Sequence, residues 1–153
     1  MALRPGFTVE SMKDRGVGKL PGLIGIELLA VEAGLLVAEV KVRPDLLAPN
    51  GYLHAATVVA LADTMCGFGC ISHLPEGASG FTTIELKSNF LGTALDGTIY
   101  TEARPQHLGS QHTAVGRRRT SSRNRQNDCA LSLHPDGAVA HPHTRSPEVT
   151  GDA

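Results

Sequence analysis

Residues 48–73 read APNGYLHAATVVALADTMCGFGCISH, and the spacing of their apolar side chains indicates the main element of the fold. From about Leu53 to His73, small apolar side chains return every three or four residues, which is the spacing of a helix with a buried face. They are Ala55, Val58, Val59, Ala62, Cys66 and Cys70. Pro75 and Gly77 end the pattern. Because small side chains let a helix approach a sheet closely, we expect a long buried helix that packs against a curved sheet.

Apolar, β-branched runs on both sides of this helix predict antiparallel strands. The runs cover Leu23–Val31, Leu35–Val42, Phe81–Leu91 and Thr98–Ala103, and a shorter helix is expected over Phe7–Arg15. Together they form an α+β layout, an antiparallel sheet wrapped around a long central helix. Such a sheet needs about five strands or more. The sequence provides four before residue 110.

Composition limits the class of protein. The chain has 153 residues, with 14 Lys plus Arg and 15 Asp plus Glu, and its formal net charge is -1. This balance argues against a surface built to hold nucleic acid or an anionic membrane. We find no run near the roughly 18 apolar residues of a membrane span. The first residues contain no apolar core of a signal peptide, so we expect a cytoplasmic protein without a membrane partner.

Two residues of the central stretch are candidates for chemistry. His54 stands where the helix begins, and Asp63 follows about two and a half turns later between Leu61, Ala62 and Thr64. A carboxylate in such apolar surroundings is costly to bury unless it is paired or used as a base. It could instead face solvent or cap a neighbouring element. Free backbone N–H groups at the start of the helix could bind an oxyanion.

The motif Asn50-Gly-x-x-His-Ala-Ala-x-x-x-x-Leu-Ala-Asp63, followed by Gly80-Phe-Thr-Thr-Ile-Glu-Leu-Lys-Ser-Asn-Phe-Leu91, resembles the hot-dog-fold acyl-CoA thioesterases. It is similar to the branch that contains the phenylacetate-degradation (PaaI-like) and the His-Gly-Gly type 4-hydroxybenzoyl-CoA thioesterases. The likeness extends from about Leu20 to Gly109. It implies the hot-dog fold and hydrolysis of acyl-CoA thioesters to free acid and CoA.

The resemblance also implies roles for particular residues. Asp63 is expected to act as nucleophile or general base, and the His54-Ala55 turn to place the Ala55 N–H against the thioester carbonyl. Thr83 is expected to position the acyl group or the attacking water, with Gly51 also at the substrate site. Ala55 stands where the family usually has Gly. Ala48 occupies the place of the family's loop Asn or Gln, so that role passes to the nearby Asn50.

The resemblance implies no cofactor and no metal ion, an acyl-CoA substrate, and a homodimer or homotetramer with sites at the interface between subunits. Cys66 and Cys70, four residues apart on the helix, are interpreted as core residues. A hydratase or dehydratase on the same fold is disfavoured, because the chain lacks the His-Phe-Pro type loop of those enzymes.

The C-terminal part has an unusual composition. From Gly116 onward there is no Phe, Tyr, Trp, Ile, Met or Lys, whereas six Arg residues and His134, His141 and His143 fall there. We therefore divide the chain into a hot-dog domain, 1–115, and a poorly ordered Arg- and Pro-rich tail, 116–153. The Arg117–Arg119 run with Arg123 and Arg125 leaves open an alternative, a non-catalytic hot-dog protein that senses acyl-CoA or binds nucleic acid.

A frameshift near Val115-Gly116 is our interpretation of this tail. Synonymous codons read one base later encode Asp-Ala-Val-Val from Gly116, and an apolar strand-like segment over 124–140. If the tail is instead genuine, we expect the sheet to lack its last strands.

Overall fold

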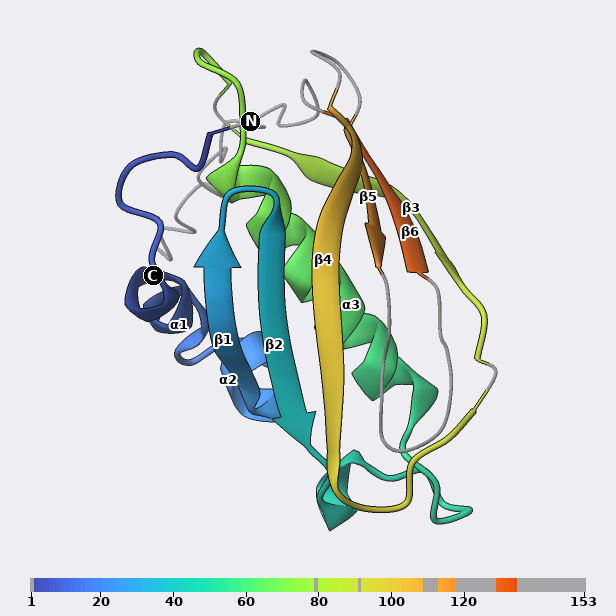
Figure 1. The fold of residues 1–153 in the computed structure, drawn as a ribbon. Helices are drawn as coiled ribbons and strands as arrows, with labels where there is room; N and C mark the ends of the chain where they lie inside the picture. The colour runs from blue at the N-terminus through green and yellow to red at the C-terminus, as the bar shows by residue number, and fades with distance from the viewer. Residues whose placement is uncertain (1, 79, 91, 109–112, 118–128, 135–153) are drawn as a thin grey trace, which may run out of the picture.

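The computed structural model describes residues 2–78, 80–90, 92–108, 113–117 and 129–134 (Figure 1). The elements in chain order are α1 (Val9–Gly16), α2 (Leu20–Ile24), β1 (Ile26–Glu32), β2 (Leu35–Lys41), the short 3-10 helix η1 (Pro44–Leu46), α3 (Ala55–Ser72), β3 (Thr82–Ser88), β4 (Thr98–Leu108), β5 (Thr113–Arg117) and β6 (Cys129–His134).

One antiparallel sheet wraps around α3. Its six described strands run in the order β1-β2-β4-β5-β6-β3, and each neighbouring pair is antiparallel. The helix α3 crosses one face of the sheet and contacts β2, β3, β4, β5 and β6, while α1 and α2 lie beside β1 (Figure 1). The predicted α+β hot-dog architecture is confirmed.

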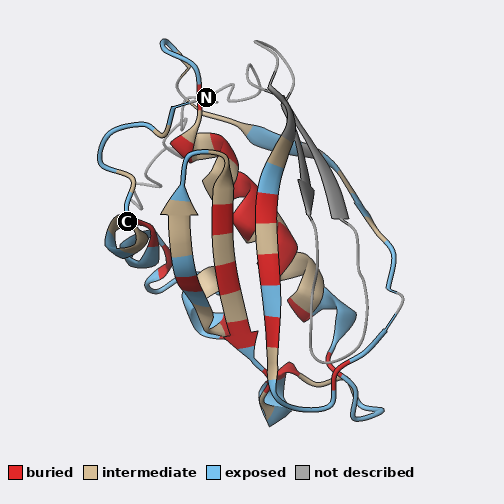
Figure 2. Cartoon of the chain, in the orientation of Figure 1, coloured by how far each residue is buried: buried red, intermediate tan, exposed pale blue. Residues whose placement is uncertain are grey.

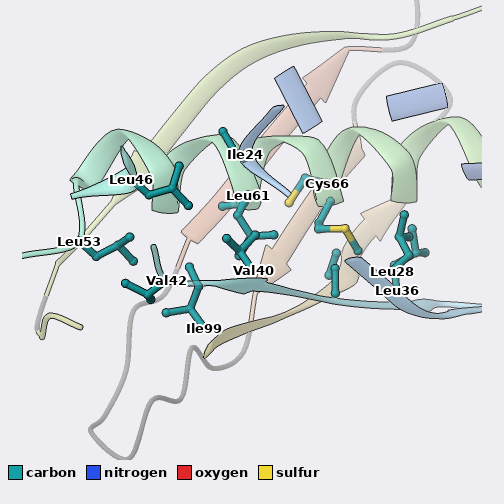
Figure 3. Packing of buried hydrophobic residues seen from close by; sticks show 14 of the residues in the cluster. Ile24, Leu28, Leu36, Val40, Val42, Leu46, Leu53, Leu61, Cys66 and Ile99 are labelled. Carbon is teal, nitrogen blue, oxygen red and sulfur yellow. The ribbon is translucent and has the colours of Figure 1, made fainter. Parts of the chain in front are cut away.

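The core lies between α3 and the central strands. Leu61 of α3 is fully buried and points towards Val40 of β2 and Ile99 of β4 (Figure 3). Met65 of α3 and Leu36 of β2 are buried in the same hydrophobic cluster. Along β2, buried residues alternate with half-buried ones (Figure 2), as the alternating sequence predicts. The strict alternation orients β2 so that one face meets α3.

One predicted strand is wrong in its first part. We expected a strand over Leu23–Val31, whereas Leu20–Ile24 is the helix α2 and β1 begins at Ile26. Pro21 lies in the first turn of α2, and Gly25 ends the helix in the left-handed conformation with φ 75°. The guanidinium of Arg43 donates to the carbonyl oxygens of Leu23 and Ile24 and so satisfies the last turn.

The expectation that a genuine tail would leave the sheet without its last strands is also wrong. Strand β5 pairs with β4, and β6 connects β5 to β3. The boundary predicted at residue 115 falls inside β5. Residues 118–128 and 135–153, with His141, His143, Arg123 and Arg125, lie outside the described residues, so the tail and the frameshift stay predictions.

The helix α3 also corrects the expectation that no stretch comes near a membrane span. By length and composition alone it could cross a membrane, since its 18 residues have a mean hydropathy of 1.5. In the structure the sheet wraps this helix, and its apolar residues form the core. Burial against the sheet therefore accounts for its apolar character.

A buried hydroxyl on β4 gives a first prediction. Thr101 is 1% exposed, and among the described residues its Oγ1 has no hydrogen-bond partner. An unpaired buried hydroxyl costs about 1–3 kcal/mol, so Thr101→Val should raise the free energy of unfolding by about 1–2 kcal/mol. Urea unfolding measures this change. Thr98→Val, at a half-buried position of the same strand, serves as control, and an equal gain there or a loss at Thr101 contradicts the prediction.

Candidate active site

A tight turn leads into α3. Gly51 has φ 83°, a left-handed conformation that glycine adopts without strain. The Ala48 N–H donates to the Tyr52 carbonyl at 2.7 Å, and the Gly51 N–H donates to the Ala48 carbonyl at 2.8 Å. Asn50 Oδ1 accepts from the Tyr52 N–H at 3.2 Å. Asn50 and Gly51 thus form the turn that delivers the chain to His54.

His54 caps the N-terminus of α3 with its ring. Its Nδ1 accepts from the Ala56 N–H at 3.0 Å, and its carbonyl accepts from the Thr57 N–H at 2.9 Å. Because Nδ1 accepts, the proton of the neutral ring is on Nε2. No hydrogen-bond acceptor for the Ala55 N–H is present in the part of the chain that the structure describes. This exposed amide at a helix N-terminus can therefore receive a partially negative oxygen.

Asp63 and Thr83 form the second part of the site. Asp63 is half-buried on α3, and its Oδ1 accepts from the Thr83 hydroxyl of β3 at 3.1 Å. The two residues are 20 positions apart in the sequence, and the fold brings them into contact. One carboxylate oxygen is thereby held in place by Thr83, which leaves the other oxygen for chemistry.

The fold does not bring the two parts together within one chain. Ala55 is the first residue of α3 and Asp63 follows eight positions later. At 1.5 Å per residue, they are separated by about 12 Å along the helix axis. An oxyanion donor must lie about 3 Å from the carbonyl oxygen that it stabilises. One thioester therefore cannot contact both groups of the same chain.

A close contact between Gly67 and Phe81 lies next to Asp63. A Cβ placed on Gly67 would lie 3.0 Å from Cζ and 3.2 Å from Cε2 of the Phe81 ring. Gly67 follows Asp63 by four residues and so lies on the same side of α3, one turn further on. No sequence motif assigned a role to Gly67 or Phe81. A glycine inside a helix, four residues after a candidate catalytic group, was the available signal.

The two cysteines of α3 belong to the core, as predicted. Cys66 and Cys70 are both buried. Burial raises the pKa of the Cys70 thiol to about 11, so this thiol stays protonated and weakly nucleophilic at neutral pH. The described residues contain no cluster of three or more His, Cys, Asp or Glu side chains that could hold a metal ion.

Comparison with known proteins decides the family. Residues 50–118 match the model of the thioesterase superfamily. The chain is 31% identical over 111 residues to the proofreading thioesterase EntH of Klebsiella pneumoniae, a match that covers 72% of this chain and 80% of that protein. The chain belongs to the thioesterase superfamily. A 1,4-dihydroxy-2-naphthoyl-CoA hydrolase of Escherichia coli is 28% identical over 109 residues, which cover 69% of this chain and 77% of that protein.

Solved structures share the fold of this thioesterase superfamily member. A thioesterase of Haemophilus influenzae superposes with a TM-score of 0.82 at 23% identity, over 94% of this chain and all of that one. The PaaI protein of Escherichia coli superposes with a TM-score of 0.67 at 19% identity, over 76% of this chain and 83% of that one. The predicted PaaI-like hot-dog fold is thus confirmed.

Membership of the thioesterase superfamily makes the protein a thioester hydrolase. The roles expected for Asp63, His54, Ala55, Asn50, Gly51 and Thr83 stay predictions. In the structure Asp63 and Thr83 are hydrogen-bonded to each other, and the other four residues lie at the N-terminal end of α3.

Proposed function

We propose that the protein hydrolyses acyl-CoA thioesters to free acid and CoA, with Asp63 as nucleophile or general base. The observation that carries the proposal is the hydrogen bond from Thr83 to Asp63, which holds in place a half-buried carboxylate, the only charged side chain of α3. As a base, Asp63 takes a proton from the attacking water. As a nucleophile, it attacks the thioester carbonyl itself, and water then releases the acid. In both cases the C–S bond breaks and the CoA sulfur leaves with a proton.

The oxyanion donor in this proposal is the Ala55 N–H of a second copy of the chain. The distance of about 12 Å along α3 excludes the Ala55 N–H of the same chain as a partner of Asp63 on one carbonyl. Two copies related by a two-fold axis can place the start of one α3 against the middle of the other. A homodimer, or a homotetramer built from such dimers, then contains paired sites.

The other residues of the turn support the donor. Asn50 and Gly51 hold the loop before α3, and the His54 ring caps the Ala56 N–H so that the neighbouring Ala55 N–H stays open. In this proposal the thioester carbonyl oxygen accepts a hydrogen bond from the backbone N–H of residue 55 and does not need its side chain. An alanine therefore serves in place of the family's usual glycine, since a backbone N–H is present in both.

An assay of CoA release tests the function. The full-length protein is incubated with short-chain, medium-chain and aromatic acyl-CoAs in the presence of a thiol reagent that detects free CoA. We expect release above the uncatalysed rate with at least one of them. Absence of release across the whole panel from folded protein contradicts the proposal. Salt-dependent binding of DNA together with such inactivity would favour the alternative, a non-catalytic nucleic-acid-binding protein.

A further inference from the structure

On the side of α3 that carries Asp63, burial increases from the N-terminus towards the C-terminal half. Ala55 and Ala56 are exposed, Asp63 is half-buried, and Gly67 is buried. Phe81, directly before β3, is half-buried, whereas Thr82 and Thr83 at the start of that strand are exposed. Asp63 therefore lies at a boundary, with a more exposed side towards Ala56 and a more buried side towards Gly67.

Two pairs of residues connect α3 with the start of β3. Asp63 contacts Thr83 through a hydrogen bond, and Gly67 contacts the ring of Phe81. Four residues of helix rise about 6 Å, and two residues of strand rise about 6.6 Å. Because these spacings match, the two contacts lie side by side along the interface between α3 and the start of β3. Strand β3 starts beside the C-terminal half of α3 (Figure 1). The Phe81 ring thus lies about one helical turn further along α3 than the Asp63 carboxylate.

We propose that Phe81 determines the size of the acyl group that the enzyme accepts. This inference rests on the proposed function. A thioester at Asp63 must direct its charged nucleotide portion towards water and its apolar acyl group away from water. The buried side of Asp63 is the side of Gly67 and Phe81. Because Gly67 has no side chain, the Phe81 ring is the group that an extending acyl chain meets there.

The contact at Gly67 fixes the position of the ring. Any side chain at this position would come within about 3 Å of Cζ, the far end of the Phe81 side chain, so the ring would have to move. We expect the displaced ring to leave less room for an acyl chain beside Asp63, and loss of the ring to leave more. Gly67 and Phe81 therefore act as one unit.

The test is the ratio of kcat/KM for hexanoyl-CoA to that for acetyl-CoA. We expect Phe81→Ala to raise this ratio about tenfold, since a few methylenes in an apolar pocket change discrimination by that order. Gly67→Ala should lower the ratio. In the double variant Gly67→Ala/Phe81→Ala, the effect of the Gly67 substitution on the ratio should disappear, because the added methyl has no ring to displace.

Phe68→Ala is the matched control. Phe68 also lies on α3, but it lines a pocket with Met12 and Leu28 on the side of α1 and β1. Its truncation removes the same atoms from a different side of the helix, about 100° around the axis from Gly67, so it should lower stability without changing the ratio. Phe81→Leu replaces Phe81→Ala if the latter does not fold.

The outcomes separate the inference from the proposed function. An unchanged ratio in folded Phe81 variants of an active enzyme overturns the inference alone, and so does an equal change in Phe68→Ala. Absence of CoA release from the wild-type protein with every acyl-CoA overturns the proposed function and this inference together.

Discussion

Asp63→Asn should lower kcat for acyl-CoA hydrolysis by about 10³-fold, because the amide can neither take a proton from water nor attack the thioester. The substitution conserves shape, and the introduced amide can still accept the hydrogen bond from Thr83 through its side-chain carbonyl. The loss should therefore appear in kcat more than in KM. Steady-state assays of CoA release with the best substrate of the panel measure it.

The matched control is Asp96→Asn, which removes an exposed carboxylate from the turn before β4. It should leave kcat within about twofold of wild type, because surface substitutions away from a site have small effects. Thermal unfolding of both variants separates lost chemistry from lost structure. An Asp63→Asn protein that is folded and hydrolyses thioesters at the wild-type rate contradicts the role of this carboxylate.

Ala55→Pro should lower kcat by about 10²–10³-fold, because it deletes the single N–H that is proposed to stabilise the oxyanion. Position 55 suits this change. It is the first residue of α3, where proline is well tolerated. The preceding residue, His54, has φ -64° and ψ 131°, an extended conformation that is compatible with a following proline.

Ala55→Ser is the control, since it changes the side chain and keeps the N–H. It should retain most of the activity, whereas Ala55→Pro should lose it at an unchanged melting temperature. Full activity in a folded Ala55→Pro protein would exclude this amide as the oxyanion donor. Loss of activity in both variants would point to the side chain of residue 55 in place of its backbone.

The fold was predictable where pattern and local signals agree. The period of small side chains predicts α3 within two residues of its observed ends, and strict alternation predicts β2. The helix α2 was missed because its apolar residues resemble a strand, whereas Pro21 and the left-handed Gly25 determine a single helical turn. Strand β6 was missed because its short segment, CALSLH, lies in a stretch dominated by arginine and polar residues.

The members of the candidate site stay predictions, and the structure adds their arrangement. A motif gives residue types at fixed spacings along the chain, so it proposed Asp63 and Thr83 as site residues without indicating the hydrogen bond between them. It also placed His54, Ala55 and Asp63 in sites at an interface between subunits, without indicating which subunit provides each residue. Helix geometry separates them, because eight residues of α3 span about 12 Å. The contact of Gly67 with Phe81 depends on how β3 approaches α3, which no local pattern encodes.

The proposed mechanism requires a site completed by two copies of the chain, and co-expression of two inactive variants tests this requirement. In a mixed dimer of Asp63→Asn and Ala55→Pro, one site combines an intact carboxylate with an intact amide, and the other site has neither. Half of randomly formed dimers are mixed, so the co-expressed protein should recover about a quarter of wild-type activity. Activity no higher than that of the separate variants would contradict a shared site.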